Sequence, residues 1–191
     1  MIRAFVAVPI ESQVIDRISA ALAELKMLGL GVRWTPAANI HLTLKFLGDI
    51  DETCVDRIAG ALEHPLQLFP RFTINAKGLG VFPDLRRPRV LWVGLIGAQL
   101  AALVSVVELN LQRLGFAAEQ RTFTPHLTIG RWRQSDRAPK TLGHLLESWK
   151  DYPFGATGVN EVILFRSVLN SAGAAHIRLK TMTLKIGDLT D

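Results

Sequence analysis

Two short segments of the sequence carry a histidine followed two residues later by a threonine. They are His41-Leu-Thr-Leu44 and His126-Leu-Thr-Ile129. Both alternate polar and apolar side chains, which is the pattern of a β-strand with one buried face. The histidine and the threonine then share the open face, with Cα atoms roughly 7 Å apart. An imidazole beside a hydroxyl can move protons and hold phosphate oxygens, so each motif suggests phosphoryl chemistry.

The sequences around the two motifs also resemble each other. Arg, Thr-Pro and His-Leu-Thr follow one another in this order in both segments, Arg33 to Leu44 and Arg121 to Ile129, with different spacing. Such a repeat predicts a pseudo-twofold arrangement that brings the two strands together. Two imidazoles would then meet in one groove, where one can accept a proton from an attacking oxygen and the other can protonate a leaving oxygen.

The elements that must position these residues alternate between strand and helix patterns. No Pro/Gly/Ser-rich linker divides the chain, which predicts a single domain over residues 1–191 made of two intertwined lobes, each with one His-x-Thr-x motif. The uncharged run 90–107 changes from strand to helix periodicity, so we expect no membrane segment there. Strands are expected at 2–8, 40–47, 71–79, 88–96, 126–132, 157–168 and 175–186, and helices at 12–28, about 52–65, 98–114 and about 139–150.

Composition excludes several classes of protein. The single cysteine, Cys54, cannot form an internal disulfide or supply a thiolate pair, which favours a reducing compartment and predicts a cytoplasmic protein. Residues 71–137 hold ten Lys/Arg against four Asp/Glu, and therefore the whole excess of positive charge. A polyanionic partner would explain this excess, but so would a basic surface that only aids solubility.

The two motifs and the blocks around them resemble the 2H phosphoesterase superfamily. Within it they are most similar to the RNA 2',3'-cyclic phosphodiesterases, historically called 2'-5' RNA ligases. The resemblance extends over the whole chain and implies an α+β, bilobal, pseudo-twofold fold, with two antiparallel sheets lining a central groove and helices outside. The supporting blocks are Arg33-Trp34, Lys45-Phe-Leu-Gly48, Gly78-Leu-Gly-Val-Phe82, Pro88-Arg-Val-Leu-Trp92 and Thr124-Pro-His126.

The resemblance also implies an activity and its residues. RNA with a 2',3'-cyclic phosphate end, such as a tRNA fragment, would be hydrolysed to a 2'-phosphate without a metal or other cofactor, and the reverse chemistry would give 2'-5' ligation. His41 would be the proton donor and His126 the proton acceptor, while Thr43 and Thr128 would bind the phosphate. Arg131 would join them, although strict alternation from His126 places it on the other face, so a bulge near Gly130 is required.

Further expectations concern substrates and assembly. Small cyclic nucleotides are a second substrate class, and the protein is expected to be a monomer. Two other functions remain open: an RNA-end binding module without turnover, and a metallohydrolase, for which the repeats offer no third ligand.

Several other residues allow a functional and a structural interpretation. Lys45 could meet phosphate or lie on a solvated strand rim, and Arg86, Arg87 and Arg89 could hold the RNA backbone or only add charge. Trp92 and Trp149 are expected in the core. Histidines 64, 144 and 176 are expected to be structural or superficial, and His176 stands where relatives commonly carry tyrosine. The aromatic residues that could stack on a base or belong to the core are Phe5, Phe46, Phe123, Trp34 and Trp132.

Overall fold

A single antiparallel path of strands forms the centre of the molecule. The protein is described by a computed structural model over residues 1–133, 139–170 and 173–185. The strands follow the order β7-β4-β5-β6-β3-β1-β8-β9, and β2 pairs with β6. Their bounds are β1 Ile2–Pro9, β2 Arg33–Trp34, β3 His41–Ile50, β4 Phe72–Phe82, β5 Val90–Ile96, β6 His126–Arg131, β7 Pro153–Val159, β8 Glu161–Asn170 and β9 Gly173–Thr183.

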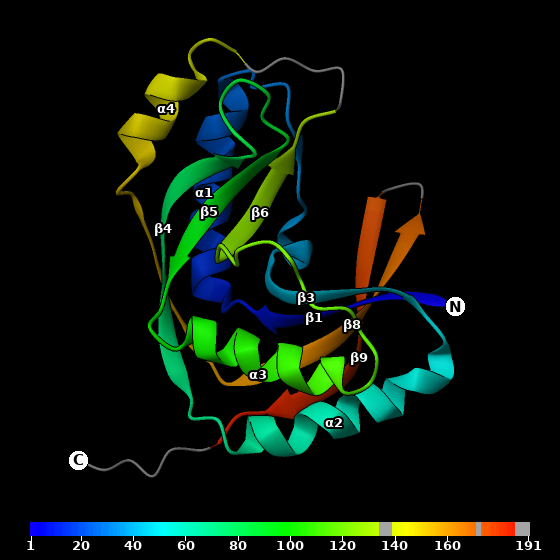
Figure 1. Cartoon of the computed structure of the whole chain (residues 1–191). Coiled ribbons are helices and arrows are strands. Elements are labelled where there is room, and N and C mark those ends of the chain that lie inside the picture. Colours follow the sequence, from blue (N-terminus) through cyan, green and yellow to red (C-terminus); the bar gives the residue numbers. More distant parts are fainter. Residues whose placement is uncertain (134–138, 171–172, 186–191) are drawn as a thin grey trace, which may run out of the picture.

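The two expected sheets are the two halves of this path, joined where β3 meets β6. That junction is one residue pair, Leu42 opposite Leu127, and both side chains are almost completely buried. The order β6-β5-β4-β7 on one side mirrors the order β3-β1-β8-β9 on the other. Figure 1 shows β4, β5 and β6 rising through the molecule while β1 and β3 cross beneath them. The two halves of the strand path therefore match in order about the pair of leucines.

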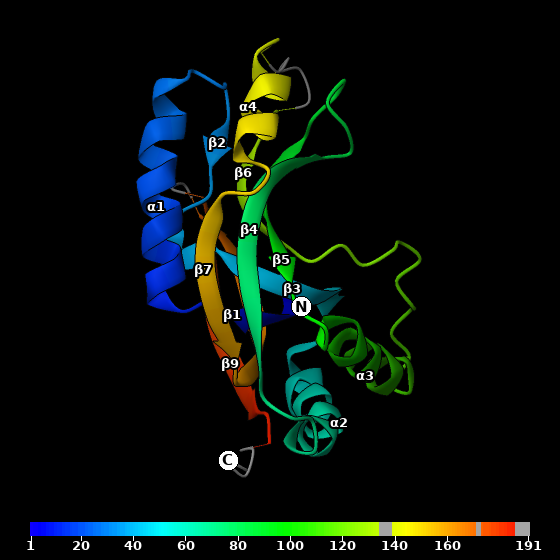
Figure 2. The same cartoon turned by 90° about the vertical axis from the view of Figure 1, so that its left-hand side faces the viewer.

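Among the described residues, four α-helices lie outside the strands, as the α+β class requires. Helix α1 (Ser12–Met27) packs against β7, and α4 (Leu142–Trp149) against β4. Helices α2 (Val55–Gln67) and α3 (Leu100–Gln112) lie side by side along the lower half, α2 against β9 and α3 against β3 (Figures 1 and 2). Two short 3₁₀ turns, η1 (Ala37–Asn39) and η2 (Glu52–Cys54), complete the described elements. Within the described ranges, no helix has the length and apolarity to cross a membrane.

Buried side chains from both halves form one large cluster. Val8 and Leu42 come from one half of the strand path, and Leu91 and Leu127 come from the other. The remaining cluster is small and lies on the opposite face of β1 and β8; it consists of Phe5, Ala7, Ile163 and Phe165. Strands β1 and β8 are therefore buried on both faces, which explains their nearly continuous apolar sequences.

The structure corrects the expected elements at the C-terminal end and at the end of helix α2. Where the sequence predicted one strand over 157–168, the chain forms β7 and β8 with a break at Asn160. The sequence did not indicate β7 because Gly155 and Gly158 interrupt its apolar residues and lower its strand propensity. Pairing with β4 stabilises the strand despite these glycines. Helix α2 also continues beyond Pro65 to Gln67, because the fully buried Leu66 holds its last turn against the core. Residue 186 of the last expected strand lies outside the described residues.

Candidate active site

His41 begins strand β3, and both of its ring nitrogens have hydrogen-bond partners. Its Nδ1 lies 2.8 Å from the carbonyl oxygen of Asn39, and its Nε2 lies 3.0 Å from Oγ1 of Thr43. Its ring stacks on Phe5 with centroids 4.7 Å apart and meets the ring of His176 edge-on at 4.9 Å. The imidazole therefore has a fixed position before any substrate arrives.

His126 begins strand β6 and repeats this arrangement in the other half. Its Nδ1 lies 2.7 Å from the carbonyl oxygen of Thr124, again two residues earlier in the chain. The edge of its ring meets Phe82 at 4.9 Å between centroids, and Trp92 lies 6.4 Å away. Both histidines thus pack against aromatic rings from neighbouring strands.

The two backbone carbonyls determine which ring nitrogen can react. A carbonyl oxygen only accepts hydrogen bonds, so Nδ1 of His41 and Nδ1 of His126 must each carry a proton. In the neutral ring the lone pair is then on Nε2. Nε2 of His41 accepts from the hydroxyl of Thr43, and Nε2 of His126 is available as a base. In both motifs the carbonyl two residues before the histidine therefore selects the same Nδ1–H tautomer.

The strand register brings the two motifs together. If the antiparallel pairing of Leu42 with Leu127 continues by one residue in each direction, His41 lies beside Thr128 and Thr43 beside His126. All four side chains are partly exposed, on the face opposite the buried leucines. Because the charge of His126 acts on His41, the two imidazoles also interact electrostatically. The pairing of β3 with β6 agrees with the predicted convergence of two imidazoles and two hydroxyls, which stays a prediction.

A β-bulge places Arg131 on the same face. Thr128 pairs with Trp92 and Gly130 with Leu91, which leaves Ile129 as the extra residue. Ile129 and Gly130 are both buried and Arg131 is exposed, so the bulge restores its side chain to the side of the histidines. The required bulge near Gly130 is therefore confirmed. Gly130 has no space for a Cβ because Val32 lies against it.

A second bulge overturns the expectation for Lys45 and for its neighbour Phe46. Val6 pairs with Lys45 but Ala7 pairs with Thr43, so Leu44 is an extra residue and the alternation reverses after it. Lys45 is consequently only 6% exposed and bonded to Glu108, neither on a solvated rim nor facing phosphate. Phe46, which strict alternation would have placed in the core with Leu42 and Leu44, is 66% exposed.

Aromatic residues and His176 form surroundings that the sequence patterns did not identify. Trp92 was expected in the core, but it lies over Gly80, packs against Phe82 and has its ring 6.4 Å from that of His126, with its Nε1 buried and unpaired. His176 was expected to be structural or superficial, but its ring contacts those of His41 and Phe5. The register of β9 on β8 decides this position, and no local pattern of the sequence encodes that register.

Other candidates lie elsewhere. Phe5 is buried and stacks on His41, so it cannot receive a base from solvent. Trp132 is a core residue whose Nε1 donates to the carbonyl of Leu30, while Phe123 and Trp149 pack against the core. Trp34 lines a cavity of about 250 Å³ against α1, with Ser19, Leu22, Lys26, Thr35, Pro36 and Ala37. The exposed His64 and His144 lie on α2 and α4.

Burial and positive neighbours make the site resist protonation. Desolvation lowers the pKa of His41 to about 4, helped by His176, Arg131 and His126 and opposed by the hydrogen bond to Asn39. Burial lowers the pKa of His126, and Arg131 lowers it further, against the effect of its bond to Thr124. Both rings are therefore neutral in the free protein at neutral pH, and an anion between them would favour their protonated forms.

The low pKa of His41 predicts a loss of stability in acid. Above its unfolded pKa of 6.5 the ring is neutral in both states, but between pH 6.5 and 4 only the unfolded chain binds the proton. This difference lowers the free energy of unfolding by about 3 kcal/mol by pH 4. In urea titrations from pH 7 to pH 4, His41→Phe should therefore lose about 3 kcal/mol less than the wild type. The exposed His64→Gln should follow the wild type, and a His41→Phe curve parallel to both would refute the prediction.

Metal ligands do not gather at this site. Across the residues that the structure describes, no three His, Cys, Asp or Glu side chains are grouped in a way that could hold a metal ion. The imidazoles of His41 and His126 can transfer protons, and the neighbouring hydroxyls and guanidinium can bind an anion.

Comparisons with known proteins agree with this geometry. The sequence profile of the LigT-like phosphoesterases matches residues 8–92 and 94–176. An RNA 2',3'-cyclic phosphodiesterase of Aquifex aeolicus is 38% identical over 168 residues, 86% of each chain. Another protein of that name, from Methanothermobacter thermautotrophicus, is 32% identical over 184 residues, 96% of this chain and 99% of the relative.

Solved structures share the fold at lower identity. TT0787 of Thermus thermophilus superposes with a TM-score of 0.80 and 23% identity, over 96% of this chain and 98% of that chain. E. coli LigT complexed with 3'-AMP gives 0.77 and 22%, over the same shares of the two chains. Together with the profile match over most of the sequence, the relatives at 30% identity and above show that the chain belongs to the LigT-like phosphoesterase family, within the 2H phosphoesterases.

Proposed function

We propose that the protein hydrolyses the 2',3'-cyclic phosphate at RNA 3' ends to a 2'-phosphate. The observation that carries this proposal is the pair of imidazoles on the neighbouring strands β3 and β6. Each has Nδ1 hydrogen-bonded to a backbone carbonyl and Nε2 available for proton transfer. The relatives named RNA 2',3'-cyclic phosphodiesterase support the substrate class. The same proposal includes the reverse reaction, in which an RNA 5'-hydroxyl forms a 2'-5' linkage.

The proposed roles divide between the two histidines. Nε2 of His126 takes a proton from water as the water oxygen bonds to phosphorus, and Nε2 of His41 protonates the departing 3' oxygen as its bond to phosphorus breaks. The phosphate then remains on the 2' oxygen. The cyclic phosphate is an anion, so its binding raises the pKa of His41 and allows this ring to carry the proton that it must donate.

Three further side chains would hold the phosphate. The hydroxyls of Thr43 and Thr128 flank the imidazoles, and the Arg131 guanidinium lies on the same face. Thr43 now donates to Nε2 of His41, and it would turn to the phosphate when that nitrogen becomes protonated. Hydroxyl and guanidinium donors match the non-bridging oxygens, which carry the negative charge of the transition state.

The loop between β4 and β5 would contact the RNA next to the cyclic end. It leaves the sheet after Phe82, whose ring touches His126, and Asp84 shapes it by accepting from the backbone N–H groups of Arg86 and Arg87. Both arginine side chains are exposed, whereas Arg89 is partly buried and bonds to the carbonyl of Arg133. We therefore assign the RNA contact to Arg86 and Arg87, and the structural role to Arg89.

Replacing both exposed arginines should weaken binding of RNA but not of a mononucleotide. For Arg86→Ala with Arg87→Ala we expect KM to rise several-fold for a cyclic-phosphate oligonucleotide and to stay unchanged for a nucleoside 2',3'-cyclic phosphate. The slope of log affinity against log salt should fall by about 0.7 for each phosphate that the variant no longer neutralises. Equal changes for both substrates, or no change for either, would remove the loop from the RNA site. Arg57→Ala, on the distant helix α2, is the control.

Product analysis tests the function itself. The protein is incubated with an oligonucleotide that ends in a 2',3'-cyclic phosphate, and the position of the phosphate in the product is determined. A 2'-phosphate supports the proposal, and a 3'-phosphate reverses the assignment of the leaving oxygen. Binding without product would favour the second candidate, an RNA-end binding module, for which the basic loop beside the histidines is the supporting observation.

The same proposal covers organisation and location. Core side chains from both halves form one cluster, which supports a single domain of two intertwined lobes. We expect a cytoplasmic monomer that also accepts small cyclic nucleotides, and size-exclusion chromatography with light scattering checks the oligomeric state.

A further inference from the structure

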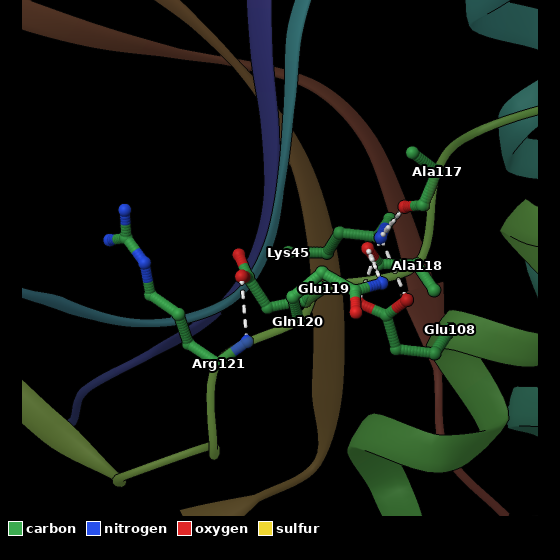
Figure 3. A network of polar contacts seen from close by, with 7 residues as sticks. All are labelled: Lys45, Glu108, Ala117, Ala118, Glu119, Gln120 and Arg121. Atoms are coloured by element: carbon green, nitrogen blue, oxygen red, sulfur yellow. Dashed lines mark hydrogen bonds and ion pairs between the residues drawn. The ribbon is translucent and has the colours of Figure 1, made fainter.

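The buried ammonium of Lys45 connects three parts of the molecule. Its Nζ donates to both carboxylate oxygens of Glu108, at 2.8 and 2.7 Å, and to the carbonyl oxygen of Ala117 at 2.8 Å. Figure 3 shows the ammonium between these two partners, one on helix α3 and one on the segment that follows it. An ammonium has three donors, so this set satisfies it completely.

The third of these bonds is unusual because of where Ala117 lies. Residues 117–123 have no helix or strand structure and connect α3 to the strand of His126. Their other hydrogen bonds are local, from Gln120 to Ala118 and from the N–H of Arg121 to Glu119. Among the hydrogen bonds of the described residues, the bond from Lys45 is the only one that ties this segment to another element.

The end of this segment determines how His126 is presented. The carbonyl of Thr124 accepts from Nδ1 of His126, and the carbonyl of Pro125 accepts from the N–H of Leu95. Thr124 O must therefore stay in place if Nε2 is to remain the basic nitrogen. The equivalent carbonyl in the first half, Asn39 O, belongs to η1, and the side chain of Asn39 is anchored to the carbonyl of Ala174 on β9 at 2.5 Å. Each histidine thus follows a segment that one polar side chain anchors: Asn39 itself in the first half, and Lys45, reaching across from the first half, in the second.

We propose that Lys45 is a positioning residue for His126: from the strand that carries His41, it anchors residues 117–123 so that Thr124 holds the imidazole in its Nδ1–H tautomer. This proposal goes beyond the proposed function but rests on it for its kinetic readout. It also explains a charge in the core of β3 that does not face the substrate. The position of His126 relative to His41 would then depend on the ammonium of Lys45.

The test must separate positioning from stability, because removing one partner of a buried ion pair is strongly destabilising by itself. The double variant Lys45→Met with Glu108→Leu removes both charges and fills the space with apolar groups, a change that commonly preserves stability. We expect its Tm to stay close to that of the wild type while kcat falls about 10- to 100-fold and KM changes little. The exposed bond after Arg121 should be cut by trypsin at least tenfold faster.

Trypsin cleavage and imidazole NMR spectra need no substrate and support the kinetics. Imidazole ¹⁵N–¹H spectra should show His126 as the Nδ1–H tautomer in the wild type and as a mixture in the double variant. Lys77→Met, which removes a lysine from an exposed ion pair with Asp151, should match the wild type in every measurement. Because proteolysis and spectra need no activity, failure of the proposed function would leave them able to decide the role of Lys45.

Defined outcomes would overturn the proposal. A double variant with wild-type Tm, kcat, cleavage rate and His126 tautomer would show that Lys45 serves stability alone. If the double variant unfolds, Glu108→Gln replaces it, because this change keeps the bond from Lys45 to Ala117. The expected result is then wild-type cleavage after Arg121 in Glu108→Gln, against cleavage in Lys45→Met that is rapid after Arg121 and unchanged at the other trypsin sites. Equally rapid cleavage in both would refute the anchor.

Discussion

Replacing His126 or His41 with alanine is expected to lower kcat for the cyclic-phosphate RNA end about 10²- to 10⁴-fold, the range of a lost general base or acid. KM should change little, because the hydroxyls of Thr43 and Thr128 and the Arg131 guanidinium remain. The double variant should be only slightly slower than the slower of the two single variants, because the two imidazoles act in one step. Initial rates at saturating substrate measure these effects.

The two histidines can be told apart by the leaving group. If the 3' oxygen of the substrate is replaced by sulfur, the leaving thiolate needs no proton, because its conjugate acid has a pKa far below that of an alcohol. His41→Ala should regain most of its activity on this substrate, and His126→Ala should not. The exposed His144→Ala on α4 serves as the control and should be fully active. Full activity of either site variant on the natural substrate would exclude two-histidine catalysis.

The shared face of the two motifs could be predicted because it depends on local alternation. From His41 to Leu44, and from His126 to Ile129, polar and apolar residues alternate and the burial follows them. The internal repeat then sufficed to predict that the strands meet. What it could not supply is the single pair, Leu42 with Leu127, through which they meet.

The errors arose where pairing partners override the local pattern. The bulge at Leu44 that buries Lys45 and exposes Phe46 is a property of the register between β1 and β3, not of the sequence around Lys45. His176 and Trp92 reach the histidines through pairings with β8 and with β4 and β6. Contacts between residues far apart in the chain leave no periodic signal in either segment. The bulge near Gly130 could be predicted, because strict alternation places Arg131 on the wrong face for the role that the resemblance implies.

Arg131 is expected to have the second largest effect, through two separable contributions. Its guanidinium lies on the face of the histidines, where it can hold the phosphate, and its charge lowers the pKa of both His41 and His126. Arg131→Gln should reduce kcat/KM about 10²- to 10³-fold, the cost of losing a preorganised donor to the transition-state oxyanion. This effect exceeds that expected for Arg86 and Arg87, which would touch only the RNA backbone.

The pH dependence separates the electrostatic contribution from the loss of the donor. Without the guanidinium the protonated imidazoles are less disfavoured, so the pKa values of His41 and His126 rise. The acid limb, where His126 gains a proton, and the alkaline limb, where His41 loses one, should both move to higher pH in Arg131→Gln. Arg131→Lys keeps the charge but loses the planar pair of donors, so its profile should stay in place while kcat/KM falls by a smaller factor. If Arg131→Gln kept the wild-type profile, its charge would not act on the histidines; if it kept the wild-type kcat/KM as well, Arg131 would lie outside the site.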